Sequence, residues 1–243
     1  MVQFFDEIPE FLFEWMKKQQ MFWVASAPLM SDGHVNVSPK GTLDCFHLVD
    51  AHRVWYEDLS GSGIETISHL RENGRITVMF TAFDGPPRIT RLFGTGTVHE
   101  FGTPEYHALI PAETRKPGSR AAIVVDIHKV STSCGYAVPF YQFVSHRTQL
   151  LRFFDKKESA ESDENGLKAY WNLKNLRSLD GLPGLLTAPD SKDTPSSSFD
   201  IDAVVQKSKS KEKGTSDKVG LLVGFAAGAL VATAVPRLLA RLQ

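Results

Sequence analysis

Three long runs of Val, Ile, Thr and Phe constrain the fold of this chain more than any other feature. They occupy residues 75–83, 88–100 and 121–130, and Pro86-Pro87 separates the first two. β-Branched and aromatic residues favour strands, whereas proline cannot donate to a central ladder and so lies between strands. The chain is therefore predicted to be mainly β, with these runs as its longest strands.

Shorter elements precede these runs. In chain order they are a helix, two strands, two more short strands and a second helix, expected at residues 9–20, 21–28, 34–38, 45–49, 54–57 and 64–73. Asp32-Gly33 suits the positive φ of a hairpin turn, and Gly74 suits the left-handed residue that ends a helix. Six or so strands with few helices indicate a small closed sheet, which also removes exposed strand edges.

The C-terminal part of the chain changes composition twice. Residues 187–218 are rich in Ser, Lys, Asp and Pro, so they are predicted to form a flexible linker that buries too little surface to offset its ordering entropy. Residues 219–235 carry no charge and would form about 26 Å of helix, close to the ~30 Å of a hydrocarbon core. We interpret residues 219–243 as a transmembrane tail anchor, with a buried helix of a soluble protein as the alternative.

Basic residues flank the predicted span unequally. Several lysines between residues 207 and 218 precede it, and Arg237 and Arg241 follow it. This bias is expected to keep the N-terminal domain in the cytosol. A short span followed by basic residues favours the mitochondrial outer membrane or the peroxisomal membrane over the endoplasmic reticulum.

Charge and cysteine content narrow the possible functions. The chain has 27 Lys and Arg against 28 Asp and Glu, a formal charge of −1, so no global field attracts nucleic acid. Its two cysteines have neither CxxC nor paired Cys/His spacing, which excludes a disulfide framework and a zinc-site motif. The sequence also lacks Ser/His/Asp, HExxH and P-loop patterns. It therefore assigns no metal ligand and no catalytic residue.

The sharpest local signal is Ser60-Gly61-Ser62-Gly63, directly before the second helix. Unpaired backbone amides, two hydroxyls and the positive end of the helix dipole together favour an anion such as a phosphate. The alternative is an ordinary serine N-cap, with Glu65 completing a capping box. Arg88 and Arg91 lie three apart on an expected strand, where one of them could reach an anion or both could simply be exposed.

Several motifs, taken in order, resemble one protein family. They are VNVSPKG, WYEDLSGSGIETISHLREN, GRITVMFTAFDGPPRITRLFGTGTV, SCGYAVPFY and LKAYWNLKNLRSLDGLPGL, within residues 35–185. The chain resembles the pyridoxamine 5′-phosphate oxidase-like flavoproteins, the FMN-binding split-barrel group. The resemblance implies a six-stranded split β-barrel, a homodimer, and FMN held in a groove between the subunits.

The resemblance also implies which residues hold the cofactor. The strand after the first hairpin would line the flavin ring through Asn36, Val37, Ser38 and Lys40. The turn before the second helix would bind the phosphate through Ser60, Ser62 and Thr66, and Arg88 and Arg91 match the family's R-x-x-R-x-x-G strand. The chain departs from the oxidase at residues 63–65, which lack its basic residue, and has no counterpart of its C-terminal substrate motif. Oxidation of vitamin B6 is therefore not expected.

These observations together predict a domain order and a function. We expect a flavin-binding split barrel over residues 1–152, an extension of it over 153–186, the linker over 187–218 and the anchor over 219–243. The leading hypothesis is a membrane-anchored FMN oxidoreductase that acts on a small molecule. The alternatives are a flavin-free barrel that serves as a membrane-tethered interaction module, and a haem-binding barrel.

Overall fold

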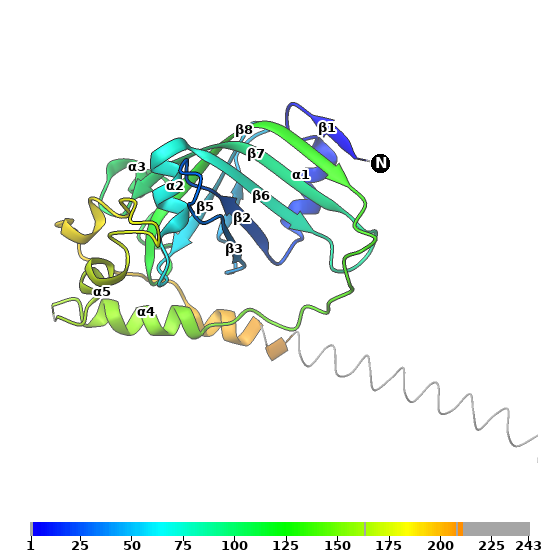
Figure 1. The fold of residues 1–243 in the computed structure, drawn as a ribbon. Helices are drawn as coiled ribbons and strands as arrows, with labels where there is room; N and C mark the ends of the chain where they lie inside the picture. The colour runs from blue at the N-terminus through cyan, green and yellow to red at the C-terminus, as the bar shows by residue number, and fades with distance from the viewer. Residues whose placement is uncertain (1, 163, 208, 211–243) are drawn as a thin grey trace, which may run out of the picture. The chain divides into compact units, whose positions relative to one another are not determined.

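The computed structural model describes residues 2–162, 164–207 and 209–210. The chain divides into two compact units, one formed by Met1–Phe143 with Arg147–Ile201 and the other by Val144–His146 with Asp202–Gln243. In the second unit, residues 202–207 are helical. All strands and helices discussed below belong to the first unit (Figure 1).

The first unit contains eight strands and five named α-helices among its described residues. The strands are β1 (Gln3–Phe5), β2 (Phe22–Ser26), β3 (Asn36–Lys40), β4 (Phe46–Leu48), β5 (Arg53–Leu59), β6 (Arg75–Thr81), β7 (Ile89–Glu100) and β8 (Ser119–Ser133). The helices are α1 (Glu10–Lys17), α2 (Glu65–Asn73), α3 (Pro104–Leu109), α4 (Gln149–Ser159) and α5 (Leu167–Lys174), with a 3₁₀ turn η1 (Ala188–Asp190).

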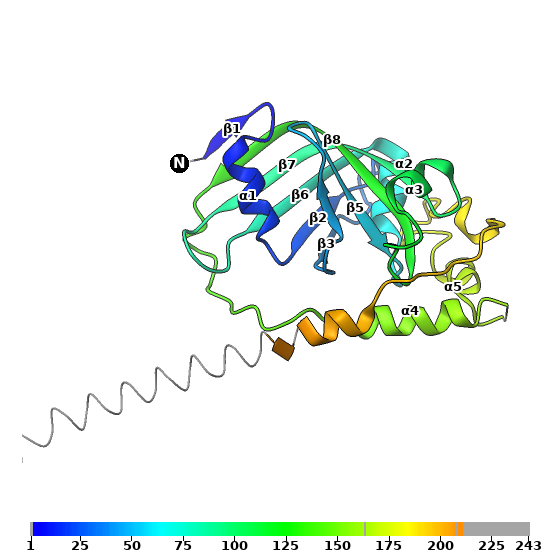
Figure 2. The same cartoon turned by 180° about the vertical axis from the view of Figure 1, so that it is seen from behind.

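The strands form one curled antiparallel sheet in the order β3-β2-β6-β7-β8-β5-β4, and β1 pairs with the far end of β8. Figures 1 and 2 show the long strands β6, β7 and β8 wrapping around the shorter ones. The mainly-β prediction is confirmed, and the curled half-barrel fits a split barrel. The described sheet has eight strands where about six were expected. All seven segments that the sequence analysis gives as strands form, and the short segment β1 adds to the edge of the long β8.

The core lies inside the curl. Phe22, Phe46 and Phe80 meet there, with ring centroids 5.0 to 5.6 Å apart. Leu12 of α1 and Ile67 of α2 are fully buried against the same cluster. Burial of this apolar surface is the main stabilising contribution to the fold.

The end of α2 follows the sequence prediction. Gly74 has a φ of 71° and its amide donates to the carbonyl of Leu70 at 3.0 Å. Glycine adopts this left-handed conformation without the steric cost of a Cβ. The predicted helix stop is therefore confirmed.

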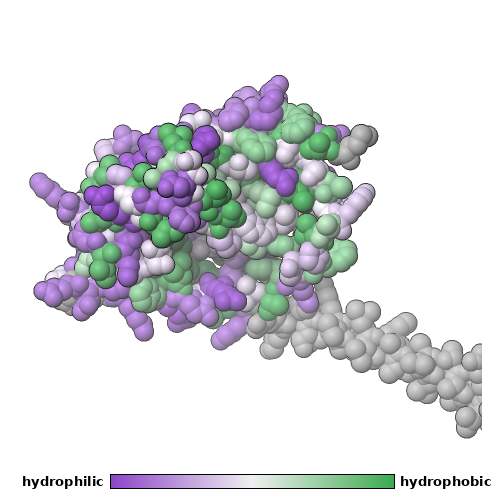
Figure 3. Space-filling model, in the orientation of Figure 1, coloured by the Kyte–Doolittle hydropathy of each residue, from purple (hydrophilic) through white to green (hydrophobic). Residues whose placement is uncertain are grey.

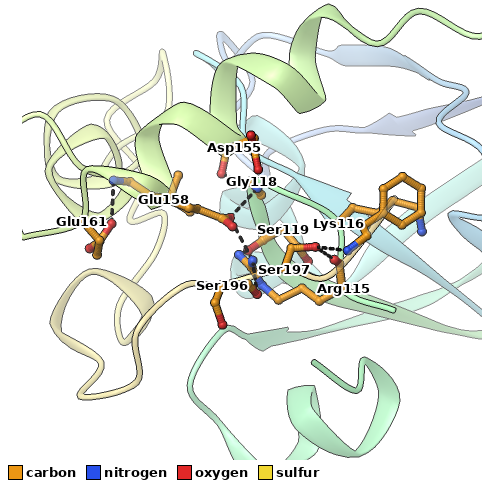
Figure 4. Close-up of polar contacts among 12 residues, drawn as sticks. Arg115, Lys116, Gly118, Ser119, Asp155, Glu158, Glu161, Ser196 and Ser197 are labelled. Carbon is orange, nitrogen blue, oxygen red and sulfur yellow. Dashed lines mark hydrogen bonds and ion pairs between the residues drawn. The ribbon is translucent and has the colours of Figure 1, made fainter. Parts of the chain in front are cut away.

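The C-terminal extension packs on the domain beyond the expected boundary. Both ribbon views show α4 and α5 at one end of the curled sheet (Figures 1 and 2). After them, the buried Glu100 carboxylate accepts the amides of Thr187 at 2.7 Å and Ala188 at 2.8 Å. The Arg115 guanidinium donates to the Ser196 carbonyl at 2.9 Å (Figure 4). The ordered domain thus extends past residue 186, after which the flexible linker was predicted to begin.

The predicted membrane span, residues 219–235, lies outside the described residues. Within the described ranges, none of the helices combines the length and the apolar character needed to cross a bilayer.

Candidate functional site

A cavity of about 340 Å³ opens between β3, the end of β5 and the start of α2. It brings together four of the residues that the sequence singled out, Ser38, Lys40, Ser60 and Thr66. The remaining lining residues are Pro39, Gly41, Thr42, Cys45, Glu57, Leu59, Gly61, Gly63, Glu65, Arg120 and Leu150. This cavity is the candidate site because it unites the two segments assigned to a cofactor.

Strand alternation decides which β3 residues face this site. Ser38 pairs with the buried Val24, and Asn36 and Lys40 share its face of the sheet. The Asn36 amide donates to the Thr66 hydroxyl at 3.0 Å, and the Ser38 hydroxyl donates to the Asn36 side-chain oxygen at 3.1 Å. Val37 points to the opposite face and is 60% exposed. β3 is therefore tied to α2 by polar side chains, whereas Val37 is separated from them.

The Ser60–Gly63 turn is held by its own side chains and backbone. The Ser60 hydroxyl is buried, donates to the Gly118 carbonyl at 2.7 Å and accepts the Trp171 indole N–H at 2.7 Å. Ser62 is exposed and does not line the cavity. The N-cap of α2 is Ile64, with no side-chain hydrogen bond, so the capping box considered as the alternative is wrong. In this structure the Ser60 hydroxyl is thus bonded to protein partners, and Ser62 lies outside the cavity.

A buried charge cluster lies at one wall of the cavity. Asp58 is fully buried and accepts Lys40 Nζ at 2.8 Å and Arg120 Nε at 2.8 Å. Burial opposes ionisation of Asp58, but the charges and hydrogen bonds of Lys40 and Arg120 outweigh it and lower its pKa to about 2. Two cations share one carboxylate, so the cluster retains one net positive charge.

The sequence missed Asp58 and Arg120 as members of the site. Arg120 also donates to the Gly63 carbonyl at 2.9 Å and to the Asn175 side-chain oxygen at 3.0 Å. Arg120 lies on β8, and its partners come from β5, the turn before α2 and the residue after α5. No local motif links segments so far apart. A buried arginine requires paired acceptors, but only the fold reveals that Arg120 is buried.

Glu57 and Asp58 are adjacent on β5 and point apart, as strand geometry predicts. Glu57 accepts the Lys116 ammonium at 2.8 Å and the Lys116 amide at 2.9 Å, and both residues are buried. Nearby, burial raises the pKa of the Cys45 thiol to about 11. Burial thus favours the protonated, less nucleophilic form of the thiol at the cavity.

Arg88 and Arg91 do not reach this cavity. The Arg88 guanidinium lies over the rings of Phe11 and Trp15, at 5.3 and 5.4 Å from their centroids. Arg91 occupies the middle of β7 between Met79 and Ser131, on the sheet face opposite the buried Leu92. Within this chain, the structure therefore separates both arginines from the other predicted site residues.

Comparison with known proteins identifies the family. A model described as pyridoxamine 5′-phosphate oxidase matches residues 8–134. The pyridoxamine 5′-phosphate oxidase family protein ustO of Aspergillus flavus is 41% identical over 200 residues, which cover 76% of this chain and 78% of that protein. This chain belongs to the pyridoxamine 5′-phosphate oxidase family.

Solved structures with a similar fold include three bacterial proteins. HupZ of Group A Streptococcus is 20% identical over 51% of this chain and 91% of its own, with a TM-score of 0.42. A protein from Clostridium acetobutylicum related to general stress protein 26 is 14% identical over 51% of this chain and 85% of its own (TM-score 0.37). A FAD-binding protein from Mesorhizobium loti is 13% identical over 54% and 95% (TM-score 0.36).

The match to the pyridoxamine 5′-phosphate oxidase family model does not contain every residue that builds the site. It ends at residue 134, whereas Trp171 and Asn175 contact Ser60 and Arg120 from the C-terminal extension. In this member of the family the site is therefore assembled partly by residues beyond the matched region.

Proposed function

We propose that this protein binds FMN and uses it as the cofactor of an oxidoreductase. The observation that carries the proposal is the cavity between β3 and α2, which gathers Ser38, Lys40, Ser60 and Thr66 beside the buried Arg120 in a chain of the pyridoxamine 5′-phosphate oxidase family. FMN ends in a phosphate, and the cavity offers a cationic wall and a helix N-terminus for it.

The residues present fit a phosphate ester. The Lys40–Asp58–Arg120 cluster supplies one net positive charge, and the N-terminus of α2 adds the positive end of a helix dipole with no side-chain hydrogen bond at its N-cap. The Glu65 carboxylate also lines the cavity, and it accepts the Leu179 amide, so a phosphate would bind on the side of Lys40 and Arg120. Gly61 lines the cavity, and a Cβ built on it meets no atom within 4 Å, so the space next to its backbone is open. A phosphate can therefore approach the backbone of the turn closely.

Bound FMN would supply hydride or electron transfer, and the chain would supply placement. Lys40 and Arg120 would bind the anionic part of the cofactor, since both present N–H donors at the cavity wall. Asn36 and Ser38 would hold the edge of β3 against α2, which fixes the width of the site. Leu150 of α4 would exclude water from one side.

The test is flavin binding by the full chain, purified in a mild detergent. We expect a yellow protein, or one that becomes yellow and quenches flavin fluorescence when FMN is added. Gly61→Val should weaken FMN binding because it fills the open space beside the turn, whereas Ser62→Ala, at an exposed position outside the cavity, should not. A protein that stays colourless in excess FMN rejects the proposal, and a Soret band in its place supports haem.

The proposal includes a homodimer and a membrane anchor. The strand register places the partly exposed Trp23 and Met79 in one row with Arg91, and Val37 lies on the same face of the sheet. Figure 3 shows apolar patches among polar ones on the domain surface. A second copy of the chain would cover this face. Light scattering of wild type and Arg91→Glu tests the dimer, and resistance of the full chain to carbonate extraction tests the anchor.

A further inference from the structure

The turn before α2 is held from outside by the C-terminal extension. Asn175, at the end of α5, is fully buried. Its side-chain oxygen accepts Arg120 Nη1 at 3.0 Å, and its amide nitrogen donates to the Gly61 carbonyl at 2.9 Å. One turn earlier in α5, the buried Trp171 donates its indole N–H to the Ser60 hydroxyl at 2.7 Å. Two side chains thus connect α5 to both walls of the cavity.

The segment after Asn175 follows α2 closely. The Leu179 amide donates to Glu65, the Ser68 hydroxyl donates to the Leu182 carbonyl, and Arg71 Nε donates to the Gly184 carbonyl. A Cβ on Gly184 would lie 2.3 Å from the Asn175 carbonyl oxygen, so only glycine permits this approach. Asn175 is therefore fixed by backbone contacts on both sides.

These contacts orient the peptide planes of the turn. In a trans peptide the carbonyl and the following N–H point in opposite directions. The Asn175 side-chain amide donates to the Gly61 carbonyl. The N–H of the next residue, Ser62, therefore points away from Asn175. Arg120 Nη1 donates to the Gly63 carbonyl at 2.9 Å, so the Ile64 N–H points away from this guanidinium nitrogen. The side chains of Asn175 and Arg120 thus fix the orientation of both peptide planes.

We propose that Asn175 and Trp171 are positioning residues for the phosphate of the cofactor. They fix Arg120 and the Ser60–Gly63 turn at the cavity wall, which Ser60, Gly61, Gly63 and Arg120 line together, so that this wall is held in place for the phosphate. The proposal rests on the proposed FMN function. It extends the site by two residues that lie beyond the part of the chain matched by the family model.

The experiment compares FMN with riboflavin, which lacks the phosphate, on the full chain in detergent. Asn175→Ala should raise the Kd for FMN about tenfold or more while changing the Kd for riboflavin much less, because a hydrogen bond to a charged group is worth about that factor. Trp171→Phe keeps the packing ring and removes only the N–H, so it tests the same effect with less risk to folding. Ser178→Ala is the matched control: it lies in the same segment, and its hydroxyl accepts the Leu182 amide instead of contacting the Ser60–Gly63 turn or Arg120.

Two outcomes overturn the proposal. One is equal loss of FMN and riboflavin binding in Asn175→Ala and Trp171→Phe, and the other is a loss in Ser178→Ala as large as theirs. If wild type binds neither flavin, the proposed function fails, and hydrogen exchange of the apoprotein decides the positioning claim separately. The Ser60 amide, which donates to the Gly118 carbonyl at 2.7 Å, should then exchange about tenfold faster in Asn175→Ala than in Ser178→Ala. Unchanged exchange refutes the claim.

Discussion

Replacement of Asp58 by Asn tests how the charged wall of the cavity is stabilised. Asp58 is fully buried, and its partners Lys40 and Arg120 have side chains that are 21% and 5% exposed. An asparagine of the same shape would leave the buried Arg120 and the half-buried Lys40 without their counter-ion. Removing one partner of a buried ion pair costs about 3 kcal/mol or more, so we expect the free energy of unfolding at pH 7 to fall by about that amount.

The pH dependence of unfolding gives a second, independent value for the contribution of ionised Asp58 to the free energy of unfolding. The pKa of Asp58 is about 2 in the folded protein against 3.8 in the unfolded chain. Because the folded pKa is depressed, its contribution of about 2 kcal/mol is complete above pH 4 and is lost as the pH falls towards 2. The difference between wild type and Asp58→Asn should therefore shrink over this window.

The assay is urea denaturation of both proteins at pH 7 and at pH 3, followed by fluorescence of the four tryptophans. Asp126→Asn is the control, since Asp126 pairs with Arg53 at the surface, where both side chains are more than half exposed, and should cost less than about 1 kcal/mol. A loss at pH 7 no larger in Asp58→Asn than in Asp126→Asn would refute this account of the cluster.

Three further changes have expected outcomes. Gly118→Ala should destabilise the domain by more than about 2 kcal/mol in thermal unfolding, because the glycine has a φ of 81° and a Cβ would lie 2.5 Å from the Phe154 ring. The control Gly85→Ala, with a φ of 66° and no atom within 4 Å of its Cβ, should cost only about 1 kcal/mol. Equal losses in the two variants would contradict the role of the clash. Glu100→Gln should free the segment after Leu186 and speed tryptic cleavage at the exposed Lys192; an unchanged cleavage rate would show that the carboxylate does not hold the segment. Ser60→Ala should cost about 1–3 kcal/mol in denaturant unfolding by leaving the buried Trp171 N–H unpaired, and a neutral result would mean that this N–H finds another acceptor.

Local patterns predicted much of the fold because their causes are local. Alternation along 36–40 places Asn36, Ser38 and Lys40 on one face and Val37 on the other, and a glycine at 74 ends α2 because it alone adopts positive φ freely. α3, by contrast, went unpredicted although Thr103 caps it through the Tyr106 amide and Pro104 opens it, a signal that the sequence does contain.

The sequence by itself determined the mainly-β fold, the family and the segments that meet at the site, since strand propensity, turn residues and motif order are properties of short stretches of chain. Only the tertiary structure decided which side chains share the cavity. It brought Asp58, Arg120 and Asn175 together, committed the Ser60 hydroxyl to Gly118 and Trp171, and placed Arg88 against Phe11 and Trp15. Burial and pairing of polar groups depend on segments distant in sequence, and the energetic penalty for an unpaired buried charge acts only once the chain has folded around it.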